Sequence, residues 1–248
     1  MKKLLAFLVL LPLCGWTGTV TESEVTKMIG DLQEGFAGAI STGVLGPPKT
    51  MGRGHFSLGL LVAGCPIKYI DPDTDKEKSV PFAMPSIYAR LGVSKSFDIG
   101  IKYAYVPKEE PIKSGSYYGA EARKGILKET IVKPDISLSL TYNKFKIDVE
   151  ENGKYSMDWD VSNYGAKLLV SKKLPLLNPY AGIGFDKYSS KIDYSISDKN
   201  INNGIKKNGN PLRMLAGCEL NLLLVKISAE LNRFGDTNIY AMSGRIGF

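Results

Sequence analysis

Residues 135–144 read DISLSLTYNK, and the alternation of apolar and polar side chains in this stretch decides the fold class. Ile136, Leu138, Leu140 and Tyr142 occupy every second position, so in an extended strand they share one face. Aspartate, serine, threonine and asparagine occupy the other face. This period of two predicts a β-strand with one apolar and one polar surface.

The same alternation recurs along most of the chain and predicts about ten strands. Most reach or exceed about 11 residues, the length that a tilted strand needs to cross a bilayer, whereas strands of soluble sandwiches are usually shorter. We therefore predict an all-β fold, a transmembrane antiparallel β-barrel of about ten strands over residues 51–248, with eight or twelve strands as alternatives. The expected strands are 54–65, 84–95, 97–107, 116–126, 134–147, 156–172, 179–194, 211–221, 223–233 and 238–248.

The first residues have the pattern of a secretory signal peptide. Lys2 and Lys3 precede an apolar run from Leu4 to Leu13, which small residues follow. The run is too short to span a bilayer as a helix. We expect a signal peptide over residues 1–19 and an exported protein, with lipidation of Cys14 as a less favoured alternative.

An amphipathic helix is predicted over residues 21–43, within an N-terminal helix and linker at 20–50. Its apolar stripe consists of Val25, Met28, Ile29, Leu32, Phe36 and Ile40. Gly43 and the pair Pro47–Pro48 end the pattern. Because the stripe needs a partner, we expect the helix to plug or cover the barrel, and we favour this over a position on the membrane surface.

Composition limits the function classes. The chain has 248 residues, 44% hydrophobic and 23% charged, which excludes disorder. With 26 Gly and 13 Tyr against one His and two Trp, it favours strands and turns over an all-helical enzyme. The net charge of +7 is spread along the chain, so we expect no nucleic-acid partner.

With its signal peptide, its alternating strands and a C-terminal Phe248, the chain resembles small bacterial outer-membrane β-barrel proteins. The segment before the first strand is similar to those of uncharacterised barrel families. The resemblance implies contact with outer-membrane lipid and lipopolysaccharide, and recognition by the barrel-assembly machinery through Tyr240, Ile246 and Phe248. Gly244 departs from the aromatic preference of that assembly signal. The resemblance implies no particular activity.

The inward faces of the predicted strands carry charges of both signs. The expected lumen-lining residues are Arg90, Lys102, Glu121, Arg123, Lys167, Arg213, Glu219, Lys226, Glu230 and Arg245. An interlocked ion-pair core is the favoured interpretation, and a narrow water-filled path is the alternative. The predicted function is thus a structural or narrow-passage role in the outer membrane.

Two other functions remain open at this stage. A barrel hydrolase would use His55, the single histidine, or the pair Asp158 and Asp160, which alternation puts on one face. A binding or transport barrel for an apolar ligand would need a continuous cavity. We expect no enzyme activity, no catalytic residue, no cofactor and no metal. Cys65 and Cys218 point to opposite faces and are not expected to pair.

Overall fold

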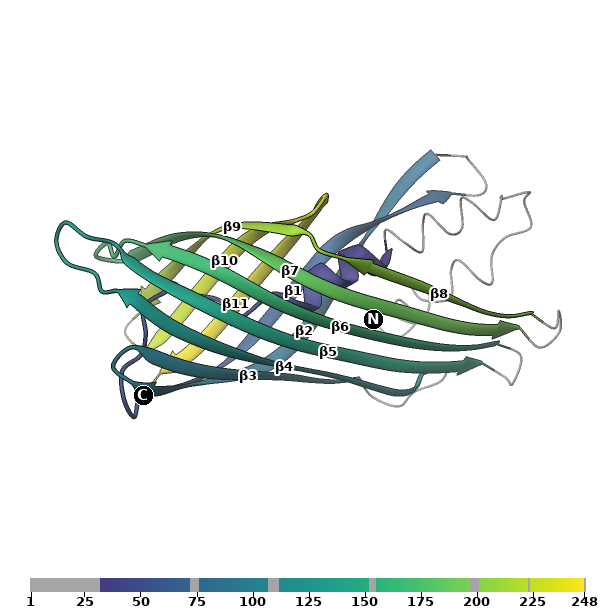
Figure 1. Ribbon diagram of the computed structural model, residues 1–248, viewed down its shortest axis with the longest axis horizontal. Helices are drawn as coiled ribbons and strands as arrows, with labels where there is room; N and C mark the ends of the chain where they lie inside the picture. Colours follow the sequence, from purple (N-terminus) through teal and green to yellow (C-terminus); the bar gives the residue numbers. More distant parts are fainter. Residues whose placement is uncertain are drawn as a thin grey trace.

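The computed structural model describes residues 32–71, 76–106, 112–151, 155–196, 201–222 and 224–247, which form one antiparallel barrel (Figure 1). Among these residues, no helix has the length and apolarity needed to cross a membrane. The strands are β1 (Phe56–Asp71), β2 (Lys76–Ser94), β3 (Phe97–Val106), β4 (Ile112–Leu127), β5 (Asp135–Glu151), β6 (Tyr155–Ser171), β7 (Leu177–Ile196), β8 (Ile201–Gly209), β9 (Leu212–Leu222), β10 (Val225–Phe234) and β11 (Thr237–Gly247).

The barrel closes with ten strands, as the sequence predicts. Strands that are neighbours in sequence pair with each other, except β8 and β9, and β1 pairs with β11 to close the barrel. The long strand β7 pairs over its first half with β9 and over its second half with β8. Asn210 and Pro211 separate β8 from β9, and proline has no N–H to continue the ladder. β8 therefore continues the line of β9 toward the outer end of the barrel and does not count as an additional strand of the wall.

Two stretches between predicted strands, residues 66–83 and 195–210, contain further strand. They include the last residues of β1, the first residues of β2 and the whole of β8. The β1–β2 ladder extends to the pair Asp71 and Lys76. The predicted strands end too early because their bounds were based on an apolar outward face. A strand needs such a face only where lipid surrounds it.

The outer wall carries an apolar belt. Leu60, Ile101 and Phe185 face outward with 64–68% of their surface exposed. A soluble protein does not leave a closed belt of large apolar side chains in water, whereas the lipid of a bilayer covers it. The chain is an outer-membrane barrel protein, in agreement with the predicted location.

Tyrosines mark one border of this belt. The rings of Tyr118, Tyr142 and Tyr164, on β4, β5 and β6, form a row with centroid distances of 6.3 and 4.9 Å. Aromatic girdles of this kind lie at membrane interfaces. The tight β2–β3 and β9–β10 turns and the end of β11 lie at the other end of the barrel, which identifies that end as periplasmic.

Beyond the tyrosine row the two faces of the wall exchange polarity. On the periplasmic side of Tyr142 in β5, Leu138 and Leu140 point outward. On the outer side of Tyr142, Phe145 and Ile147 point inward. The outer part of the barrel is thus apolar inside and polar outside, as in a water-soluble protein. The part of the barrel on the periplasmic side of the tyrosine row is polar inside and apolar outside.

On β7 the apolar side chains change from odd to even positions near Lys187, and the exit of the strand from the membrane explains this change, since the β6–β7 register has no bulge. Even-numbered residues of β7 point inward without interruption, from Tyr180 through Asp186 to Ile192. The apolar side chains move from odd to even positions because the strand crosses the membrane border. The change therefore lies in the environment and not in the strand.

The N-terminal helix, described over residues 32–40, lies inside the outer part of the barrel (Figure 1). The ring of Phe36 contacts Phe145 and Trp159 at centroid distances of 4.4 and 4.3 Å. Gly38 allows close approach, since a Cβ there would lie 2.9 Å from Ile239. The helix therefore occupies the interior and not the membrane surface. Residues 21–31 of the predicted helix and the predicted signal peptide lie outside the described residues.

The polarity of the wall gives a direct test. Leu138→Arg is expected to lower the free energy of unfolding by about 2–4 kcal/mol, because it places a charge in the lipid belt. Asp148→Arg, on the same face of β5 but beyond Tyr142, is the matched control and is expected to change stability by less than about 0.5 kcal/mol. Urea unfolding in lipid vesicles measures both. Equal losses would show that the belt is misplaced.

Candidate functional site

Residues 32–53, here called the plug segment, run through the barrel from its outer end to its periplasmic mouth. At the outer end, Glu34 forms an ion pair with Lys207 at 3.1 Å. Residues 41–48 are all buried. At the mouth, the Thr50 hydroxyl donates to the Lys95 carbonyl in the β2–β3 turn at 3.1 Å. The chain then reverses into β1 through Gly52 and Gly54, both with positive φ.

The end of the helix is held by a buried lysine of the wall. Lys102 Nζ donates to the Ile40 carbonyl at 2.8 Å and also to the Thr42 carbonyl. The Tyr117 hydroxyl donates to the same Ile40 carbonyl at 2.6 Å. Carbonyls at a helix end have no partner within the helix, so these donors satisfy them. The helix accordingly stops at Ile40, three residues before the predicted end at Gly43.

Arginines bind the extended part of the plug segment. Arg123 donates to the carbonyls of Val44 and Pro47 at 3.0 and 2.9 Å. Glu121 accepts the Val44 N–H at 2.7 Å. Arg245 donates to the Leu45 carbonyl at 2.9 Å.

The next residue of the segment, Gly46, has a φ of 125°. A Cβ at this position would lie 2.5 Å from Arg245 Nη1, so glycine is required by the backbone conformation and by the space.

Four buried ion pairs connect the charged side chains of the lumen. The pairs are Arg90–Asp98 at 2.5 Å, Arg123–Glu121 at 2.7 Å, Arg213–Asp186 at 2.7 Å, and Arg245–Glu219. Each arginine also donates a hydrogen bond to the plug segment. A carboxylate from the wall therefore balances each arginine charge while the plug segment takes up remaining donors.

All ten predicted lumen-lining side chains point into the barrel. Nine are buried, and Lys226 is half-buried at the periplasmic mouth. Asp98 and Asp186 were missed, although both form ion pairs there. Asp98 has the same parity as Lys102, so alternation could have found it. Asp186 was hidden by the change of polarity along β7.

Two residues of the predicted assembly signal lie on the outside of the terminal strand. Tyr240 and Ile246 point outward, exposed by 57% and 41%. Phe248 lies outside the described residues. Recognition by the assembly machinery stays a prediction.

The residues named for a hydrolase are not brought together. His55 is exposed at the periplasmic mouth. Asp158 and Asp160 point outward at the other end, where they form ion pairs with Lys146 at 3.2 Å and with Lys144. The described residues contain no cluster of three or more potential metal ligands. An apolar ligand would bind in the apolar interior at the outer end of the barrel, and the N-terminal helix occupies this space.

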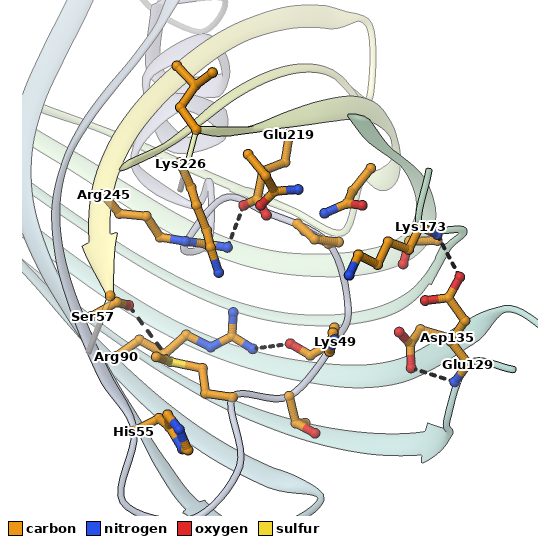
Figure 2. Close-up of a pocket in the computed structure, with 18 of the residues that line it drawn as sticks. Lys49, His55, Ser57, Arg90, Glu129, Asp135, Lys173, Glu219, Lys226 and Arg245 are labelled. Atoms are coloured by element: carbon orange, nitrogen blue, oxygen red, sulfur yellow. Dashed lines mark hydrogen bonds and ion pairs between the residues drawn. The ribbon is translucent and has the colours of Figure 1, made fainter. Parts of the chain in front are cut away.

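A cavity of about 860 Å³ opens at the periplasmic mouth, below the plug segment (Figure 2). We call it the vestibule. Its basic residues come from separate elements and surround the space: Lys49, Arg90, Lys173, Lys226 and Arg245. Its carboxylates are Glu129, Asp135 and Glu219.

A sequence model of a family of unknown function, DUF6588, matches residues 70–248. The chain belongs to the DUF6588 family. The matched region contains β2 to β11 and leaves the plug segment outside. No curated protein matches the DUF6588 chain significantly in sequence.

Solved outer-membrane barrels resemble the DUF6588 chain in structure at low identity. The translocator domain of the autotransporter NalP from Neisseria meningitidis is 13% identical, with 90% of this chain and 95% of that chain covered and a TM-score of 0.49. The outer membrane protease OmpT from Escherichia coli is 9% identical, with 78% and 95% covered and a TM-score of 0.47. Ail, the attachment invasion locus protein of Yersinia pestis, is 13% identical, with 79% and 99% covered and a TM-score of 0.36.

Lys102 provides a test of how the DUF6588 barrel holds its plug segment. Lys102→Met keeps the length of the side chain but leaves the Ile40 and Thr42 carbonyls with one donor fewer each. A buried unpaired carbonyl costs about 1–3 kcal/mol, so hydrogen exchange of the amides at 40–45 is expected to accelerate by about 10- to 100-fold. Lys128→Met, in an exposed turn, is the control. Unchanged exchange in Lys102→Met would contradict this role of the lysine.

Proposed function

We propose that this protein is a self-plugged outer-membrane barrel with a structural role at rest, through which solute passes only when the plug segment leaves the lumen. The observation that supports the proposal is the set of hydrogen bonds from wall side chains to the backbone of residues 40–49. The plug segment is therefore bound by the lumen rather than merely lying in it.

The two halves of the plug segment are held differently, which bears on how it would leave. The helix is held by apolar packing around Phe36, in the part of the barrel beyond the tyrosine row. The extended part is held by hydrogen bonds and charges, which water and ions replace at low net cost. Departure of the segment would leave a lumen lined by arginine, lysine and carboxylates, which suits a narrow aqueous path.

Removal of the helix tests the closure. Deletion of residues 21–43 is expected to raise single-channel conductance in planar bilayers several-fold, while the barrel still shows the heat-modifiable gel mobility of a folded outer-membrane barrel. The full-length protein is the reference in the same bilayers. If the folded deletion variant conducts like the full-length protein, the helix does not close the lumen.

A reversible disulfide between the helix and the wall distinguishes a barrel that opens for solute from a purely structural one. A Cβ at Gly35 would lie 3.1 Å from the sulfur of Cys65, a separation that suits a disulfide. Oxidised Gly35→Cys is expected to suppress any voltage-induced openings of the wild type, and a reductant is expected to restore them. Gly35→Cys combined with Cys65→Ser is the matched control. Openings that persist in the locked protein would overturn the proposed gating, and a wild type that never opens would support the structural role alone.

A further inference from the structure

We infer that the vestibule is a binding site for a small organic anion with two or more negative groups, carried on carboxylates or phosphates. The inference concerns the plugged barrel and does not depend on whether the plug segment ever leaves. The cavity volume of about 860 Å³ lies in the range of small-molecule sites.

The charges of the vestibule are not balanced within it. Five basic side chains and three carboxylates line the cavity, and Asp98, the ion-pair partner of Arg90, lies just behind this lining. With Asp98 counted, one positive charge is left in excess. All three carboxylates already have partners. Glu219 is paired with Arg245, Asp135 accepts the Glu129 N–H at 2.9 Å, and Glu129 accepts the Lys173 N–H at 2.7 Å.

The ammonium groups of the vestibule remain available. Lys49, Lys173 and Lys226 form no ion pair with any residue in the described part of the chain. Lys226 lies directly opposite Arg245 in the β10–β11 ladder. Glu219 balances the charge of Arg245, and an anion in the vestibule would balance that of Lys226, which would further reduce the repulsion between the two opposed cations.

One buried donor in the lining independently indicates a ligand. Arg90 is 4% exposed and donates through Nη2 to Asp98 and to the Lys49 carbonyl, but its Nε has no partner. An unsatisfied buried donor or acceptor is costly, so groups of this kind in the wall of a cavity are typical of a binding site.

The positions of the charges select a ligand with more than one anionic group. Arg90 lies on β2, Lys226 on β10 and Lys173 in the β6–β7 turn, and Figure 2 shows them on different sides of the space. A single carboxylate reaches one of these sides. An anion with two or three charged groups reaches several and forms charge-assisted hydrogen bonds with each.

The experiment is calorimetric titration of the full-length folded protein in detergent with citrate and, separately, with pyrophosphate. Acetate is the singly charged control ligand. Citrate or pyrophosphate is expected to bind at least tenfold more tightly than acetate. The tighter of the two identifies carboxylate or phosphate as the preferred group.

Variants assign the binding to the vestibule. Lys226→Gln and Lys49→Gln are each expected to weaken binding about tenfold, because each removes one charge-assisted contact. Lys128→Gln, an exposed lysine in the β4–β5 turn that does not line the cavity, is the matched control. Gel mobility confirms that each variant is folded.

Three results would overturn the inference: no binding of either polyanion at millimolar concentration, unchanged affinity in both vestibule variants, or equal weakening in the control. Because the measurement uses the plugged barrel without a membrane potential, its failure is distinguishable from a failure of the gating proposal.

Discussion

The structure depends on one requirement, that a non-helical backbone buried inside the barrel must find hydrogen-bond partners. Residues 41–48 are buried and lie outside helix and sheet, so they satisfy almost none of their own carbonyls. The wall supplies the missing donors through Lys102, Arg123 and Arg245. The basic side chains of the lumen therefore match a plug segment whose carbonyl oxygens lack backbone partners.

That arrangement also explains the acidic side chains. Unpaired arginines would be expensive to bury in the lumen, and each of the four has a wall carboxylate within hydrogen-bonding distance. Glu121 both balances an arginine charge and binds the plug segment. It pairs with Arg123, accepts the Ser139 hydroxyl at 2.8 Å and accepts the Val44 N–H. Plug segment and wall thus form one polar network while the segment lies in the lumen.

The membrane imposes a second level of organisation. In the lipid belt the wall is apolar outside and polar inside, and beyond the tyrosine row the order is reversed. At the outer end of the barrel the apolar interior accommodates the helix through Phe36 and its aromatic neighbours. Toward the periplasmic end the polar interior accommodates the extended chain. The two types of packing divide the plug segment at the point where the helix ends, so one continuous segment fits two different environments.

The barrel, a count of about ten strands and the inward direction of the charged side chains follow from the sequence alone. These features follow from a period of two and from parity, which are local properties of each strand. Asp186 and the apolar inward faces of β5 to β7 escaped this reasoning, because the same alternation has the opposite meaning once a strand leaves the lipid. The direction of the plug segment, the pairing of Arg213 with Asp186 and the vestibule become visible only in the folded barrel. Each of these joins residues far apart in the chain, and their contacts depend on closure of the sheet around a buried segment, which no local pattern encodes.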